Sequence, residues 1–63
     1  GRKSDAEFAH FLNIAAGSAS EVEEELLLSV DLGFLDDLIF QKLDKEVKEI
    51  KAMLGKLIDT LHE

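Results

Sequence analysis

Two long runs of apolar residues at three- and four-residue intervals, broken once at Gly33, most constrain what this chain can fold into. Such spacing keeps side chains on one face of an α-helix. The first run consists of Phe8, Leu12, Ala15, Ala19, Val22 and Leu26. The second consists of Phe40, Leu43, Val47, Ile50, Leu54, Leu57 and Leu61. No proline interrupts either run, so the pattern predicts an all-α fold of two helices.

Capping residues mark both ends of the first predicted helix. Ser4 is a candidate N-cap, and Glu7, three residues later, completes a capping box. Gly33 is suited to the C′ position, where a helix often ends with a positive φ. We therefore expect a helix over about 5–32.

A short turn at 33–36 leads into the second predicted helix, over about 37–62. Asp36 is its candidate N-cap, and Leu35 and Phe40 occupy the two positions of a hydrophobic staple. Because the connection is short, the two helices are expected to form an antiparallel hairpin within a single domain.

A two-helix hairpin cannot enclose a hydrophobic core by itself. The chain has 63 residues and no cysteine, so disulfides cannot supply the missing stability and association remains. The sequence predicts a hairpin that completes a four-helix bundle, either by dimerisation or together with two further N-terminal helices. Because the chain begins at Gly1 without an initiator methionine, we expect a fragment of a longer four-helix bundle.

Six consecutive small residues, Ala15 to Ser20, predict a place where another helix packs closely. Gly17 within a helix costs about 1 kcal/mol relative to alanine, which close approach of a neighbour would explain. Gly17 and Glu21 face away from the apolar stripe, so a neighbouring subunit is expected on their side. The predicted packing seam comprises Phe8, Leu12, Ala15, Gly17, Ala19, Glu21, Val22, Leu26, Leu27 and Leu28.

The charge of the chain is strongly acidic, with a formal net charge of −7. This sign disfavours nucleic-acid binding by the chain alone, and only Arg2 and Lys3 are candidate contacts. The acidic run Glu21–Glu25 is interpreted either as a solvated face or as a surface for a basic partner. With no membrane-spanning run and no signal segment, we expect a cytoplasmic protein that does not bind membranes.

No residue pattern indicates catalysis, a metal site or a cofactor. Glu7 and His10 have the Glu-x-x-His spacing of di-iron bundles, but His10 lies about 160° from the centre of the apolar stripe and points outward. Ser18, Ser20 and the histidines lack the strained turn that positions a catalytic serine. We therefore predict that the protein is not an enzyme and has no small-molecule substrate.

One set of residues resembles a known family. It consists of Gly1 to Ser4, Glu7-Phe8, Phe11-Leu12, Ile14-Ala15, Gly17-Ser18, Glu21, Leu26 to Leu28 and Asp31 to Leu35. Together these residues resemble the second half of the four-helix-bundle proteins named after the 23S ribosomal RNA intervening sequence. The resemblance implies a bundle of about twice this length that assembles into rings, commonly pentamers.

That family is similar to the accessory variability protein of diversity-generating retroelements, which partners a reverse transcriptase and contacts nucleic acid through a basic surface. This chain differs because the first two helices are absent and the remainder is acidic. We therefore predict a non-enzymatic scaffold that self-associates as a dimer or larger ring. The alternative is a nucleic-acid-binding or reverse-transcriptase accessory module.

Overall fold

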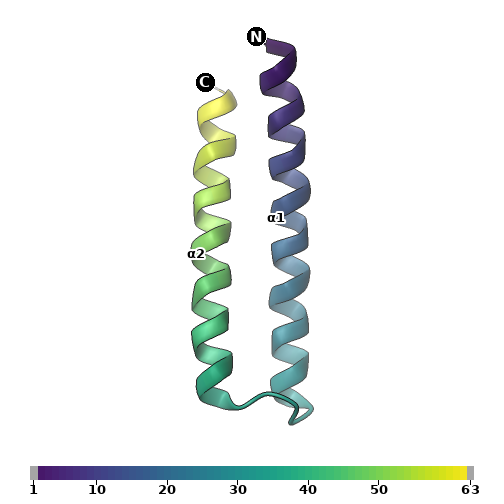
Figure 1. Cartoon of the computed structure of the whole chain (residues 1–63), viewed down its shortest axis with the longest axis vertical. Helices are drawn as coiled ribbons and strands as arrows, with labels where there is room; N and C mark the ends of the chain where they lie inside the picture. The colour runs from purple at the N-terminus through teal and green to yellow at the C-terminus, as the bar shows by residue number, and fades with distance from the viewer. Residues whose placement is uncertain (1, 63) are drawn as a thin grey trace.

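The computed structural model describes the backbone of residues 2–62 and the side chains of residues 3–62. Helix α1 spans Arg2–Asp31 and helix α2 spans Asp37–His62. The two helices lie side by side in opposite directions, so that the start of α1 and the end of α2 are at the same end of the molecule (Figure 1). Its principal extents are 47 × 14 × 10 Å. The predicted all-helical hairpin is confirmed.

The start of α1 differs from the prediction. The helix begins at Arg2, so Ser4 lies inside its first turn and the assignment of Ser4 as the N-cap is wrong. None of the residues from Arg2 to Ser4 is a helix breaker, and each added residue gains a backbone hydrogen bond once the helix has formed. The serine therefore does not stop the helix.

The end of α1 is a Schellman motif at Gly33. Gly33 has a φ of 80°, its amide donates to the carbonyl of Val30 at 3.1 Å, and the Phe34 amide donates to the carbonyl of Ser29 at 2.9 Å. These bonds satisfy carbonyls that the helix end would otherwise leave unpaired. The predicted role of Gly33 is confirmed, and α1 ends at Asp31, one residue before the predicted end.

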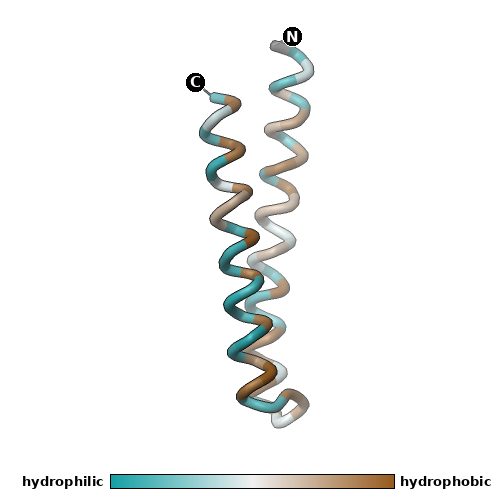
Figure 2. The backbone as a smooth tube through the Cα atoms, turned by 60° about the vertical axis from the view of Figure 1, so that its left-hand side comes forward, coloured by the Kyte–Doolittle hydropathy of each residue, from teal (hydrophilic) through white to brown (hydrophobic). Residues whose placement is uncertain are grey.

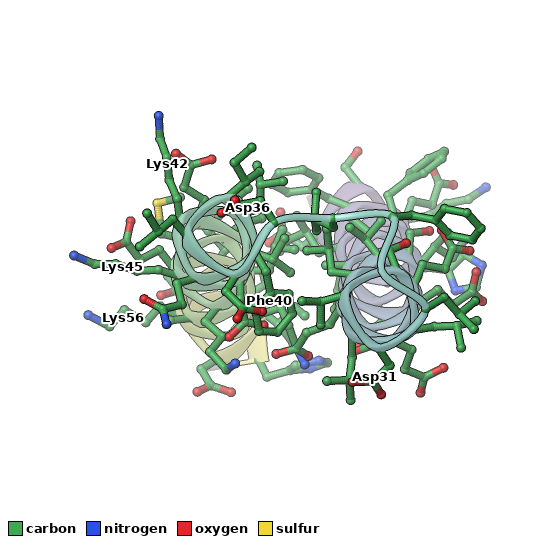
Figure 3. All side chains as sticks on the ribbon, turned by 90° about the horizontal axis from the view of Figure 1, so that it is seen from below. Asp31, Asp36, Phe40, Lys42, Lys45 and Lys56 are labelled. Atoms are coloured by element: carbon green, nitrogen blue, oxygen red, sulfur yellow. The ribbon has the colours of Figure 1, made fainter. Side chains whose placement is uncertain are left out.

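The start of α2 follows the predicted cap. The Asp36 carboxylate accepts a hydrogen bond from the Leu38 amide at 2.7 Å, and the Asp36 carbonyl accepts the Phe40 amide at 2.8 Å. Leu35 and Phe40 are both half-buried. Figure 3 shows Phe40 between the two helices, close to the connection.

The residues that face the other helix form an inner stripe on each helix, spaced by three and four as in an antiparallel coiled coil. The inner stripe of α1 is Ala9, Leu12, Ala16, Ala19, Glu23, Leu26 and Val30. The inner stripe of α2 is Phe40, Asp44, Val47, Lys51, Leu54, Ile58 and Leu61. Of the side chains that the structure describes, only Ala9 and Leu12 are buried, at 5% and 8% exposure.

The inner stripes correct the predicted ones. Phe8 and Val22 of α1 were expected to face α2, and Ile50 and Leu57 of α2 were expected to face α1, but all four are 44–50% exposed. Each helix carries more apolar surface than one neighbouring helix can cover, so the pairing buries one strip and leaves the adjacent one open. In Figure 2, hydrophobic residues recur along α2 at nearly every turn between hydrophilic ones.

Neither helix, over the residues that the structure describes, is long and apolar enough to cross a bilayer.

Candidate association surface

Seven large apolar side chains form what we call the open apolar face. Each directly precedes an inner residue of its own helix and is 44–68% exposed. Phe8, Phe11 and Val22 come from α1, and Ile39, Ile50, Met53 and Leu57 come from α2.

All seven lie on the same side of the hairpin. A step of one residue turns a side chain by about 100° around the helix axis. Because α2 faces α1 and runs in the opposite direction, the same step moves side chains of both helices towards one side. The seven residues therefore form one surface, with half-buried Ala15 and Leu43 between them.

The opposite side, which we call the polar flank, consists of residues that directly follow an inner residue. Only Leu27 is a large apolar side chain among them. The set is His10, Asn13, Gly17, Ser20, Glu24, Leu27, Asp31, Gln41, Lys45, Lys48, Ala52, Gly55, Asp59 and His62. The side of the open apolar face also carries the polar residues Ser18, Glu25, Ser29, Glu46 and Thr60. The large apolar side chains are nevertheless concentrated on that side, which gives it the character of a packing surface.

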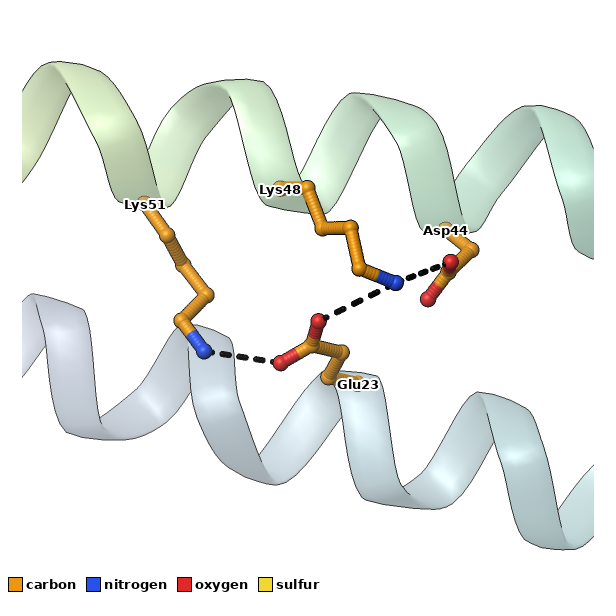
Figure 4. Close-up of polar contacts among 4 residues, drawn as sticks. All are labelled: Glu23, Asp44, Lys48 and Lys51. Carbon is orange, nitrogen blue, oxygen red and sulfur yellow. Dashed lines mark hydrogen bonds and ion pairs between the residues drawn. The ribbon is translucent and has the colours of Figure 1, made fainter.

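Charged side chains bridge the helices towards the polar flank (Figure 4). The Lys51 Nζ donates to Oε1 of Glu23 at 2.7 Å, and the Lys48 Nζ lies 3.5 Å from Oε2 of the same carboxylate. Lys48 also pairs with Asp44 on its own helix, as the i,i+4 spacing predicts. The Glu23 side chain is 23% exposed and that of Lys51 is 35% exposed, so the contact is partly shielded from water.

These contacts shift two pKa values in the directions that stabilise ion pairs. The hydrogen bond from Lys51, aided by the charges of Lys51 and Lys48, lowers the pKa of Glu23 although partial desolvation opposes it. The hydrogen bond to Asp44, followed by the attraction of Asp44 and Glu23, raises the pKa of Lys48 against the same opposing effect. Both groups are therefore charged at neutral pH.

The surface depressions are shallow and offer no assembled chemistry. One, of about 280 Å³, lies against Glu23, Glu24, Leu27, Phe40, Asp44 and Lys48. Another, of about 420 Å³, lies against Lys3, Ala6, Glu7, His10 and Phe11. Within residues 2–62, no three His, Cys, Asp or Glu side chains are grouped closely enough to hold a metal ion.

The predicted seam residues are distributed over several sides of the hairpin. Three belong to the inner stripe of α1 (Leu12, Ala19 and Leu26), three lie on the side of the open apolar face (Phe8, Ala15 and Val22) and the others point elsewhere. Leu12 is buried and Ala15, Ala19 and Leu26 are half-buried; Phe8 and Val22 are on the open apolar face; Gly17 and Leu27 are on the polar flank; Glu21 and Leu28 are on the outer side of α1.

The remaining predicted residues lie near the first turn of α1. Lys3 is exposed beside His10. The side chain of Arg2, the other candidate nucleic-acid contact, lies outside the described side chains.

A Cβ added at Gly17 would meet no atom within 4 Å, so this hairpin by itself does not require glycine there.

Sequence reasoning missed two groups of residues. Ile50 and Leu57 were assigned to the contact with α1, which concealed their place on the open apolar face. Glu23 was interpreted only as part of the acidic run Glu21–Glu25, and Lys51 was given no role, although each stands at a regular position of a three-four repeat. The signal that could have identified them is that each of these two opposite charges stands between apolar neighbours of its own three-four series.

Comparison with known proteins identifies a family. A sequence model of the family described as 23S rRNA-intervening sequence protein matches residues 1–56. No curated protein and no solved structure matches the chain.

Proposed function

We propose that this chain, which belongs to the 23S rRNA-intervening sequence protein family, is a non-enzymatic helical-bundle protein that acts by self-association and scaffolding. The observation that carries the proposal is the open apolar face. A surface with two phenylalanines and five large aliphatic side chains from two helices exceeds what isolated exposed apolar residues explain.

A second hairpin is the simplest cover for that face. Two open apolar faces packed together produce a four-helix bundle, whose core consists of the inner stripes and both faces. The alternative cover is a pair of helices from a further segment of the same protein. In either arrangement the polar flank points away from the helices that cover the open apolar face.

A neighbouring subunit on the other side of α1 is a further part of the proposal. The run of six small residues from Ala15 to Ser20 supports it, together with the open space that this hairpin leaves beside Gly17. A Gly17→Ala variant should associate more weakly if a neighbouring backbone approaches there. Gly55→Ala, which also fills open space within a helix, is the matched control and should leave association unchanged.

Analytical ultracentrifugation over a range of protein concentrations tests self-association directly. The chain should sediment as a dimer or larger species, and Ile50→Glu on the open apolar face should shift it towards monomer. Gln41→Glu places the same charge on the polar flank of the same helix and should not. A stably helical monomer at every concentration would refute the proposal.

The second candidate is a nucleic-acid-binding or reverse-transcriptase accessory module. The observation in its favour is that Lys42, Lys45 and Lys56 are exposed and point away from α1 (Figure 3). Glu46, Glu49 and Asp59 lie among them on the same helix and oppose binding to phosphates. A mobility-shift assay with structured RNA at moderate salt, with no shift above background, would remove this candidate.

A further inference from the structure

The inner stripes contain a charged layer in an otherwise apolar series. Between Ala9 and Val30 on α1 and between Phe40 and Leu61 on α2, the inner residues are apolar except Glu23, Asp44 and Lys51. A charged group at such a position contributes less to stability than a packed apolar side chain. Polar residues at these positions can instead determine which helices pair and in which register.

The charges are divided unequally between the two helices. Glu23 is the single charged residue in the inner stripe of α1, and both lysines that contact it belong to α2. From Ser4 to Asp31, α1 contains no lysine or arginine. In a pairing of α1 with another α1, Glu23 would therefore lose both cations.

The register is equally constrained. Glu23 faces Lys51, and a slip of one heptad would place it opposite Asp44 or Ile58 instead. The first alternative brings two carboxylates together, and the second leaves a charge against an apolar side chain. Only the observed register supplies Glu23 with Lys51 and Lys48 together.

From this arrangement we infer that Glu23 and Lys51, with Lys48 and Asp44, are specificity residues that restrict α1 to pairing with α2 in one register. The residues act while the open apolar faces associate. Four helices with similar apolar stripes then meet. If two α1 helices paired with each other instead of with α2, Glu23 would be separated from Lys51 and Lys48. The inference rests on the self-association proposed above, but because it concerns which helices are neighbours it does not depend on whether the assembly is a dimer or larger.

The test replaces the charged layer with apolar residues. Glu23→Leu combined with Lys51→Leu should fold and melt at the same or a higher temperature, because packed leucines replace a partly exposed ion pair. The variant should nevertheless no longer form a single arrangement of helices. Native mass spectrometry should resolve several assemblies where the parent chain shows one.

A cross-link identifies the pairing. The chain has no cysteine, so Ser20→Cys introduces a single thiol beside the inner stripe of α1, on the polar flank. When Ser20→Cys is the only change, oxidation should give little covalent dimer. When Ser20→Cys is combined with Glu23→Leu and Lys51→Leu, covalent dimer should become the major product. The exchanged pair, Glu23→Lys with Lys51→Glu, restores opposite charges and should return the cross-linked fraction to the parent level.

The inference fails if the two-leucine variant remains a single species with background cross-linking. It also fails if the exchanged pair cross-links as strongly as the two-leucine variant. Ile50→Glu, in contrast, should reduce association without raising the cross-linked fraction, which separates a failure of this inference from a failure of the proposed scaffold function.

Discussion

The ammonium group of Lys51 lies 2.7 Å from the Glu23 carboxylate and joins the two helices at the centre of their contact. Both residues occupy positions where the neighbouring members of each series are apolar. The pair is a partly exposed ion pair, so we expect it to contribute more to the choice of partner than to the free energy of unfolding.

The Glu23 carboxylate should make stability depend on pH. Its pKa in the folded chain is lowered below the ordinary value of 4.5, so its stabilising effect is complete above that value and disappears as the pH falls through the folded-state pKa. The melting temperature of the parent chain should exceed that of Glu23→Gln near neutral pH. The difference should narrow as the pH falls below 4.5.

Glu24→Gln, a change on the exposed polar flank, is the matched control and removes the same formal charge. It corrects for the general effect of reducing a net charge of −7. High salt should diminish the difference in melting temperature between the parent chain and Glu23→Gln, since screening weakens a partly exposed ion pair. If the difference in melting temperature between the parent chain and Glu23→Gln were the same at neutral and acidic pH, it would contradict a stabilising role of the ionised Glu23 carboxylate.

The Asp36 carboxylate should stabilise the start of α2. Asp36→Ala removes the acceptor of the Leu38 amide and should lower stability by about 1 kcal/mol. For a chain of this size that corresponds to a fall in melting temperature of roughly 4–8 °C at constant protein concentration. Asp37→Ala removes a neighbouring charge at the same helix end and should lower the melting temperature less. If the two variants lowered it equally, that would argue against Asp36 as the N-cap of α2.

Two glycines should respond to alanine with opposite signs. Gly33 has a φ of 80°, so Gly33→Ala should cost about 1–2 kcal/mol even though a Cβ would meet no atom within 4 Å. Gly55 lies inside α2 with equally open space, so Gly55→Ala should stabilise the chain by about 1 kcal/mol. Thermal unfolding followed by circular dichroism measures the change in stability of both variants. If both changes had the same sign, the backbone conformation of Gly33 would not control the stability of the turn.

The small size of Ala19 should be essential to the helix pair. Ala19 is half-buried in the inner stripe of α1, so Ala19→Leu should overpack the contact with α2 and cost roughly 1–3 kcal/mol. Ala6→Leu, at an exposed position of the same helix, is the control and should change the melting temperature little. Unchanged melting of Ala19→Leu would mean that the helices do not pack closely at this position.

Much of the fold could be predicted because its determinants are local. The two helices follow from repeated apolar spacing without proline, and the turn follows from Gly33 and Asp36, which satisfy backbone groups within a few residues. The prediction at Ser4 was wrong for a related reason. A capping residue does not end a helix when the residues before it also favour helix.

Which apolar strip each helix buries was decided by tertiary structure. On α1, the series through Phe8 and Val22 and the series through Ala9 and Glu23 both satisfy three-four spacing with Leu12 and Leu26. The sequence by itself determined two amphipathic helices and a well-specified turn. Only the pairing of the helices selected the second series, because small alanines permit close contact and Lys51 supplies the cation that Glu23 needs. The same selection left the large apolar side chains on the open apolar face.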